Sequence, residues 1–411
     1  MTAQTKPESQ STSSAGEDQD QRLVTYVSQV MDIDQLTWGK AQDEFLVLFK
    51  GRLTQPSRRA YDRLDENLRP LEITTIFKKH RRDHVVILKK GIIQPKERNS
   101  WVNVVLFLIT FLSILFAGML TTYTGPAVLD LSVIWSHVQP KLGESLGFAV
   151  SLLAILTAHE FGHYFTARKH DTRVTLPYFI PFPLSPFGTM GAFISLQEPP
   201  KNKRVLLDIG IAGPLAGLVV AVPVLLYGLS LSPVQQLPQP LPEITQFEGN
   251  SLLYLFLKYV VHGRLLPEPA SFNGIPPLIY WIRYFFTGLP LPSGGVDVLL
   301  HPVAWAGWAG LLVTSLNLLP AGQLDGGHLV YGLFGEKAKE FWPYILVILV
   351  VLGFAWSGWW LWAFLILIFG RVQAEPLDQI TELDPRRRAL AVFGLVVFVL
   401  VFTPVPLYIV G

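Results

Sequence analysis

The spacing of apolar residues predicts a small soluble domain ahead of residue 98. The stretch "RLVTYVSQVM" has helical apolar spacing, and "EFLVLFKGRL" is strand-like. Residues 56–71 again show helical spacing, with their charged residues turned outward. "ITTIFKK" and "HVVILKKG" predict the two strands of a hairpin joined by a charged turn. Residues 22–97 are therefore expected to form a compact α/β domain, ferredoxin-like or related, acting as a stable appendage or as a regulatory or substrate-sensing unit.

Beyond residue 100 the apolar residues gather into long runs typical of membrane-spanning helices. The first, "WVNVVLFLITFLSILFAGML", has about the 20 apolar residues that a helix needs to cross the hydrocarbon core. Six further runs lie near 145–165, 205–230, 302–320, 342–354, 358–370 and 389–410. Residues 98–411 are thus expected to form a polytopic α-helical membrane domain of about seven spans, with its chemical core near 145–335.

Lysine and arginine residues beside these runs predict the orientation of the chain. Lys96 and Arg98 precede the first run, Arg168 and Lys169 follow the second, and Lys203 precedes the third. The predicted topology brings every such cluster to one side, which the positive-inside rule assigns to the cytoplasm together with the N-terminal domain. The bacterial plasma membrane is the expected location, and a plastid membrane is the second choice.

Two segments fit neither pattern. Residues 1–21 lack the apolar core of a secretory signal, and their acidic residues are unusual for a transit peptide, so a disordered tail is expected. Residues 232–300 are rich in Pro and Gly and hold two apolar pieces too short to span comfortably, "LLYLFLKYVVHG" and "LIYWIRYFFTG". These pieces are interpreted as interfacial helices on the outer face, or alternatively as a shallow pair of extra spans.

The amino-acid composition limits the kinds of metal site and catalytic site that the chain can form. The chain is 50% hydrophobic and only 16% charged, and its net charge of +2 gives no indication of a nucleic-acid partner. There are no cysteines, which excludes disulfides, thiolate metal sites and cysteine nucleophiles. Any metal ion must therefore be held by His, Asp or Glu.

The run "LLAILTAHEFGHYFTARKH" places His159, Glu160 and His163 inside a predicted membrane helix. An ionisable residue at that depth costs about 2.5–3.5 kcal/mol on insertion scales, so three of them require a compensating partner. Residues i and i+4 share one helix face, so both imidazoles can bind one cation, and Glu160 can take a proton from water. H-E-x-x-H on a helix is the signature of zinc proteases. A metal-free polar network between helices is the alternative.

A second acidic position lies at the matching depth of a later run. Asp325 follows Leu324 in "SLNLLPAGQLDGGH", where Pro320 and Gly322 break the helix and let Asp325 turn inward. A catalytic zinc commonly has three protein ligands, and Asp325 is the candidate for the third. Asn317 can donate a hydrogen bond to a substrate carbonyl or oxyanion, or alternatively to a neighbouring helix.

Taken together, "HEFGH" and "NLLPAGQLDGGH" resemble the two motifs of the site-2 protease family of intramembrane zinc metalloproteases. The resemblance implies one Zn²⁺ per chain held by His159, His163 and Asp325, with Glu160 as general base and Asn317 as a substrate-positioning residue. It also implies that the substrates are transmembrane proteins in the lipid bilayer.

Two other stretches extend the resemblance. "PFPLSPFGTMGAFISLQEPP" is similar to the family's re-entrant β-hairpin, in which Gly188 and Gly191 permit tight turns and contact substrate; an interfacial Pro-rich loop is the alternative. "DIGIAGPLAG" is similar to the family's next helix, whose small residues pack on the metal helix. No PDZ-like insert is evident, which favours a branch similar to the cyanobacterial and chloroplast members.

The predicted function is therefore that of an intramembrane zinc metalloendopeptidase that hydrolyses peptide bonds in or near transmembrane segments. Two other classes of protein use the same residues. A metal transporter would need polar residues along several spans, whereas the imidazoles and acids here gather at one depth. An inactive scaffold that binds membrane proteins would be indicated by loss of Glu160 or of a ligand, and all of them are present.

Overall fold

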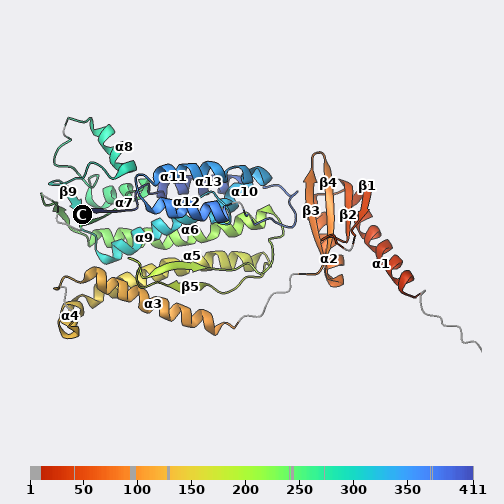
Figure 1. Cartoon of the computed structure of the whole chain (residues 1–411), viewed down its shortest axis with the longest axis horizontal. Helices are drawn as coiled ribbons and strands as arrows, with labels where there is room; N and C mark the ends of the chain where they lie inside the picture. Colours follow the sequence, from red (N-terminus) through yellow and green to blue (C-terminus); the bar gives the residue numbers. More distant parts are fainter. Residues whose placement is uncertain are drawn as a thin grey trace, which may run out of the picture. The chain divides into compact units, whose positions relative to one another are not determined.

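The computed structural model describes residues 11–40, 42–92, 99–126, 130–239, 241, 245–272, 274–370, 372 and 374–410. By internal contacts the chain divides into two compact units (Figure 1). Unit 1 comprises Met1–Pro95, Pro199–Arg204 and Glu375–Glu382. Unit 2 comprises Lys96–Glu198, Val205–Ala374 and Leu383–Gly411.

Unit 1 is built on a four-stranded antiparallel sheet with the order β1-β2-β4-β3. The strands are β1 (Met31–Trp38), β2 (Val47–Leu53), β3 (Ile73–His80) and β4 (Asp83–Lys90). Helices α1 (Ser11–Ser28) and α2 (Ser57–Leu68), the latter followed by the short helix η1 (Arg69–Leu71), pack their apolar residues on the sheet. The ring of Tyr61 on α2 meets that of Phe77 on β3 edge to face at 5.5 Å.

Two elements of unit 1 differ from the sequence-based expectation. Helix α1 begins at Ser11, so residues 11–21 are helical rather than part of a disordered tail; residues 1–10 lie outside the described residues. These first turns are almost entirely polar and carry an Asp18–Arg22 ion pair one turn apart at 2.7 Å, so no apolar face reveals the helix. Strand β1 was not predicted because it is largely exposed and contains a bulge between Ile33 and Gln35, which disrupts the alternation of a strand.

Two short segments from beyond residue 98 also belong to unit 1, although the expected domain was continuous over 22–97. The Phe77 N–H donates to the Leu377 carbonyl at 2.8 Å and the Gln379 N–H donates to the Phe77 carbonyl at 3.0 Å, so this segment extends the sheet at β3. Asp378 is fully buried and accepts hydrogen bonds from Ser57 Oγ at 2.7 Å, from the Ile380 N–H at 2.9 Å and from the Thr381 N–H and hydroxyl. A single buried carboxylate thus fixes the added segment.

Replacement of Asp378 by Ala is expected to release this segment from the sheet. A lost hydrogen bond to a charged group costs about 1.5–3 kcal/mol, and Asp378 accepts several. The Asp378 N–H also donates to the Lys201 carbonyl, so trypsin cleavage after Lys201 should become faster in Asp378→Ala. Glu382→Ala, an exposed acid of the same segment, is the matched control. Equal cleavage rates in both variants would contradict this role of Asp378.

Unit 2 contains the apolar helices. Among the described residues, three regions are long and apolar enough to cross a membrane, and their helices are α3 (Trp101–Thr122), α5 (Leu142–Lys169) and α6 (Lys203–Ser230). The other predicted runs form shorter helices: α9 (Pro302–Asn317), α11 (Trp342–Leu352), α12 (Gly358–Phe369) and α13 (Pro385–Val401). Helix α3 packs on α5, α5 on α9, and α11 on α12 (Figure 1). Helix α10 (Asp325–Phe334), followed by η3 (Gly335–Glu340), packs on α13.

A β-hairpin lies between α5 and α6 in the chain. Its strands, β5 (Tyr178–Pro181) and β6 (Thr189–Phe193), pair antiparallel and pack on α3, and β6 also contacts α5. Ser113 Oγ donates to the Gly188 carbonyl at 2.6 Å, and the rings of Phe107 and Phe179 meet edge to face at 5.1 Å. The hairpin is therefore fixed against the side of α3.

The Pro- and Gly-rich region contains two 11-residue helices, α7 (Leu252–His262) and α8 (Pro277–Thr287), where the short apolar pieces lie. Strand β7 (Val234–Gln236) pairs with β9 (Val296–Val298), and β8 (Thr245–Glu248) pairs with β10 (Leu407–Val410). Helix α4 (Leu131–Val138) and η2 (Gln139–Lys141) precede α5. Lys258 of α7 is fully buried 4.5 Å over the Tyr254 ring, and the Tyr254 hydroxyl donates to Glu248 at 2.9 Å. Burial raises the pKa of the Glu248 carboxyl.

Candidate metal centre

His159 and His163 lie one turn apart on α5, and both imidazoles are buried. Their Nε2 atoms are 3.2 Å apart and their ring centroids are 4.9 Å apart. The i, i+4 spacing on a continuous helix thus directs both rings to one point, as the sequence predicts.

Asp325 reaches the same point from the first residue of α10. Its Oδ2 lies 3.4 Å from His159 Nε2 and 3.3 Å from His163 Nε2. The chain turns between α9 and α10 at Gly322, whose φ of +58° suits glycine. A Cβ on Gly326 would stand 2.0 Å from the Leu318 carbonyl oxygen, so the start of α10 folds closely back on the end of α9. The helix break at Pro320 and Gly322 therefore directs the carboxylate inward.

The hydrogen bond of His163 defines which of its nitrogens faces the site. Its Nδ1 lies 2.7 Å from the Ile209 carbonyl oxygen, which can only accept, so Nδ1 carries the proton. The lone pair of Nε2 then points toward His159 and Asp325. This is the arrangement that fixes a metal-ligating histidine in the correct tautomer and orientation.

Helix α6 approaches α5 closely at this level because glycine faces the two histidines. A Cβ on Gly213 would lie 2.0 Å from His163 Nε2, and one on Gly217 would lie 3.2 Å from His159 Nδ1. On the other helix, a Cβ on Gly162 would lie 2.6 Å from the Ala212 carbonyl oxygen. The small residues of "DIGIAGPLAG" thus make room for the imidazoles.

Glu160 and Asn317 complete the predicted site. Glu160 is buried beside the two histidines, and the backbone N–H of Ile194, at the end of the hairpin, lies near its carboxylate. Asn317 is the last residue of α9, and its Nδ2 lies 3.2 Å from His159 Nε2. All five polar residues predicted from the two motifs therefore converge, from α5, α9 and α10.

The two glycines of the hairpin lie in different surroundings. Gly188 has a φ of +71°, and a Cβ there would lie 2.5 Å from Ile114 Cα and from the Ser113 carbonyl oxygen, so it is packed against α3. Gly191 has a φ of +99° and faces open space. Of the two, only Gly191 has room beside it for a substrate.

One ionic cluster near the site was not predicted. Asp208 of α6 accepts hydrogen bonds from Arg387 of α13, with Nη2 at 2.6 Å and Nε at 2.9 Å, and His170 Nε2 lies 2.9 Å away. Arg387 also bonds Asp384 at 2.6 Å. Asp208, an acidic residue at the start of an apolar run, was the signal in the sequence that a partner exists. The cluster links the end of α5 to α6 and α13.

His328, on the first turn of α10, does not belong to the group of three donor atoms. A Cβ on Gly210 of α6 would meet the Cβ of His328 at 2.8 Å, so this histidine packs between α10 and α6. Among the described residues, His159, His163 and Asp325 form a group whose donor atoms all lie within 4.8 Å of one another. Two imidazoles and one carboxylate are a donor set that zinc accepts, with one position left open.

Comparison with known proteins agrees with this geometry. The model of peptidase family M50 matches residues 147–353. The chain is 29% identical over 343 residues to "Probable zinc metalloprotease EGY1, chloroplastic" of Arabidopsis thaliana, covering 78% of this chain and 56% of that protein. It is 28% identical over 260 residues to "Probable zinc metalloprotease EGY2, chloroplastic" of Oryza sativa subsp. indica, covering 63% and 42%.

The chain thus spans about half the length of the curated relatives that it matches. No solved structure gives a significant match. The family match nevertheless takes in half of the chain and contains both motifs, from the histidine pair to Asp325. This chain therefore belongs to peptidase family M50, the family of the site-2 proteases.

Proposed function

We propose that this protein is an intramembrane zinc metalloendopeptidase. The observation that carries the proposal is the convergence of two imidazole nitrogens and one carboxylate oxygen, each from a buried or partly buried side chain, at one point beside Glu160. The names of the relatives, which describe zinc metalloproteases, support the same metal and reaction. One zinc ion held by His159, His163 and Asp325 supplies the Lewis-acid chemistry for peptide hydrolysis.

The chain's own residues supply the proton transfer and the stabilisation of charge that the reaction needs. The Glu160 carboxylate accepts a proton from the attacking water and later gives it to the leaving amine. Glu160 is buried beside the two histidines, which keeps its carboxylate at the site. The Asn317 amide, whose Nδ2 lies 3.2 Å from His159 Nε2, donates to the carbonyl oxygen of the scissile bond and stabilises the negative charge that develops there. His163 keeps its orientation through the Ile209 carbonyl.

Transmembrane proteins in the lipid bilayer are the proposed substrates. The hairpin packs on Ser113 and Ile114, close to the middle of the 22-residue candidate span α3, which supports a hairpin that enters the membrane. Ile194, the residue after strand β6, lies near Glu160, so an extended substrate paired along β6 would lie beside the general base. The open space at Gly191 is consistent with such a substrate.

The proposed topology keeps seven spans, formed by α3, α5, α6, α9, α11, α12 and α13. Helices α11 and α12, with 11 and 12 residues, are the shortest of the seven. If these two helices formed a hairpin that enters and leaves the membrane on one side, α13 would keep the orientation that it has in the seven-span topology. The segments before α6 and before α13 both belong to unit 1, which supports one common side for these helix starts. We assign that side to the cytoplasm or its plastid equivalent.

The relatives named above are chloroplast proteins, which supports a plastid membrane. The bacterial plasma membrane, the first choice from the sequence, has no support among these relatives. Neither the transporter nor the scaffold is favoured by any feature of the site. Glu160 would lack a role in either, and among the described residues the potential metal donors gather in one group rather than along a path.

Removal of the metal tests the proposal. The purified protein should contain about one zinc per chain, as expected for a three-ligand catalytic site. Dialysis against a chelator should abolish cleavage of single-span membrane substrates, and stoichiometric Zn²⁺ should restore it. Cleavage that persists in zinc-free protein would overturn the proposed reaction.

A further inference from the structure

Helix α6 presents one backbone atom to the metal centre, the carbonyl oxygen of Ile209, which accepts the His163 Nδ1 proton at 2.7 Å. The helix is poorly suited to hold this atom in place by itself. Pro214 lies inside α6 and cannot donate to the carbonyl four residues before it, and three glycines between 210 and 217 lower the stability of the same turns. The position of the Ile209 carbonyl therefore depends on contacts that α6 makes with other helices.

One face of α5 contacts this part of α6. His163 and Ala167 lie on that face at i and i+4, and His170, directly after the helix, lies at i+7. Ala167 and Ile209 belong to one buried apolar cluster, and His170 Nε2 lies 2.9 Å from Asp208 Oδ2. Asp208 and Ile209 are neighbours in α6, so the contact at Asp208 fixes the same turn that presents the carbonyl to His163.

Arg387 of α13 holds the Asp208 carboxylate through a forked contact. Its Nε and Nη2 donate to Asp208 at 2.9 and 2.6 Å, and the two side chains are 31% and 15% exposed. Asp384, directly before α13, accepts from Arg387 Nη1 at 2.6 Å and from the Arg387 N–H at 3.1 Å. Because the guanidinium is fixed by Asp384 and binds through two of its donors, it defines the position of Asp208 more strictly than a single ammonium contact would.

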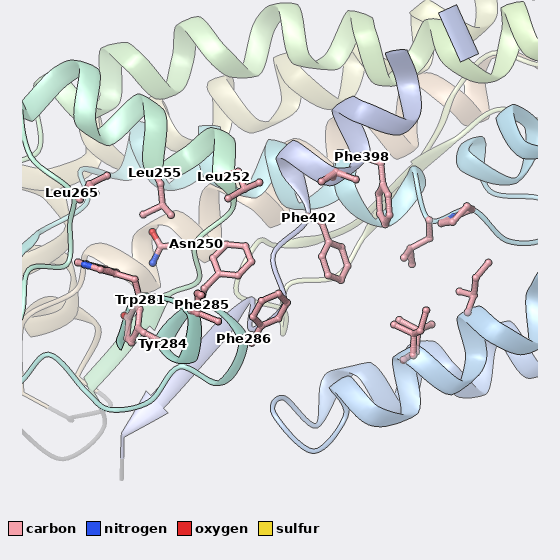
Figure 2. A pocket seen from close by; sticks show the side chains of 17 residues that line it. Asn250, Leu252, Leu255, Leu265, Trp281, Tyr284, Phe285, Phe286, Phe398 and Phe402 are labelled. Atoms are coloured by element: carbon pink, nitrogen blue, oxygen red, sulfur yellow. The ribbon is translucent and has the colours of Figure 1, made fainter. Parts of the chain in front are cut away.

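Helix α13 also packs on α10, the helix that begins with the third predicted ligand. A Cβ on Gly394 of α13 would lie 2.3 Å from Leu329 Cδ2 of α10 and 3.0 Å from Ile211 Cδ1 of α6. Farther along the chain, Phe398 and Phe402 instead face an apolar cavity of about 550 Å³ that α7, α8 and α11 also line (Figure 2). These contacts with α6 and α10 come from the part of α13 that precedes the cavity.

We propose that Arg387 is a positioning residue of the metal centre, a role that rests on the proposed function. It acts through Asp208 on the Ile209 carbonyl, and through that carbonyl on the orientation of His163. Arg387 lies outside residues 147–353, which the family model matches, so α13 adds a support from beyond the matched region. An ion pair that served only the stability of the fold would leave the zinc affinity unchanged, and this difference separates the two roles.

Titration of zinc against a competing chelator tests this role without requiring turnover. Full-length Arg387→Gln should bind zinc about tenfold more weakly than wild type, the lower end of the range for losing a partner of a metal-ligating histidine. Arg388→Gln removes the same charge from the next position, which is exposed, and should bind zinc like wild type. Equal affinities of Arg387→Gln and wild type, or equal losses in both variants, would overturn the role of Arg387.

Two further variants keep the test decisive if Arg387→Gln does not fold. Arg387→Lys keeps the charge but loses the fork, so an intermediate loss of zinc affinity is expected. Asp208→Asn should weaken zinc binding at least as much as Arg387→Gln, and combining the two should add little, because Arg387 acts through Asp208. Additive losses in the double variant would contradict this order of action.

Thermal unfolding of the same zinc-free proteins is measured in parallel. A lower unfolding temperature of Arg387→Gln with unchanged zinc affinity would assign the pair to fold stability alone and overturn the positioning role. If wild type binds zinc and every variant matches its affinity, the positioning role fails while the metal centre stands. If wild type itself binds no zinc, the proposed function fails.

Discussion

Glu160→Gln is expected to lower the rate of peptide hydrolysis by roughly 10²–10⁴-fold, the usual contribution of a general base. Glutamine keeps the size of the side chain and one carbonyl oxygen that accepts hydrogen bonds, but it cannot take a proton from water. Glu160 does not belong to the group of three donor atoms, so bound zinc should be unchanged. The measurement is kcat on a single-span substrate together with metal content of the same sample.

The matched control for this variant is Glu144→Gln, which makes the same change in the first turn of α5. Its activity and metal content should equal those of wild type. A Glu160→Gln protein that retains more than about a tenth of the wild-type kcat would fall outside the range for a general base and would assign the proton transfer to another group.

Gly213→Ala is expected to remove zinc without altering any ligand. The added Cβ would stand 2.0 Å from His163 Nε2, so the imidazole or the whole of α6 must move. His163 would then also lose its bond to the Ile209 carbonyl on the same helix. Loss of an outer partner of a metal-ligating histidine costs roughly 10–100-fold in metal affinity, and direct displacement of the donor atom should cost at least as much.

Alanine substitutions at two other glycines are expected to have smaller effects on zinc affinity. Gly217→Ala places a Cβ 3.2 Å from His159 Nδ1, which a small shift can accommodate, so a smaller loss of zinc affinity is expected. Gly143→Ala in α5 meets no atom within 4 Å and should bind zinc like wild type. Zinc titration of the three variants should give the order Gly143→Ala, Gly217→Ala, Gly213→Ala from tightest to weakest. The reverse order would refute the packing argument.

The group formed by His159, His163 and Asp325 was the most predictable part of the molecule. Ionisable side chains are costly in an apolar run, so His159, His163 and Asp325 stood out, and helical periodicity then brought the first two together. The match in depth of two runs was enough to place Asp325 beside them. The tautomer of His163, by contrast, depends on the carbonyl of Ile209, which no sequence pattern indicates because every residue has one.

Features that depend on contacts between distant segments were not predictable. The pairing of Phe77 with Asp378 joins the predicted strand "ITTIFKK" to a short stretch about 300 residues away, and that second stretch has no periodicity that marks it as part of a sheet. The Asp208–Arg387 pair is similar, since an arginine beside an apolar run is ordinarily explained by orientation alone. Helices α11 and α12, by contrast, match the predicted runs 342–354 and 358–370 to within two residues.

The most direct test compares bound zinc and cleavage in three purified proteins: wild type, Glu160→Gln and His159→Ala. We expect that wild type binds zinc and cuts a single-span substrate, that Glu160→Gln binds zinc but does not cut, and that His159→Ala does neither. If Glu160→Gln cuts as well as wild type, or if His159→Ala keeps full zinc occupancy and activity, the proposed metal centre is not the site of peptide hydrolysis.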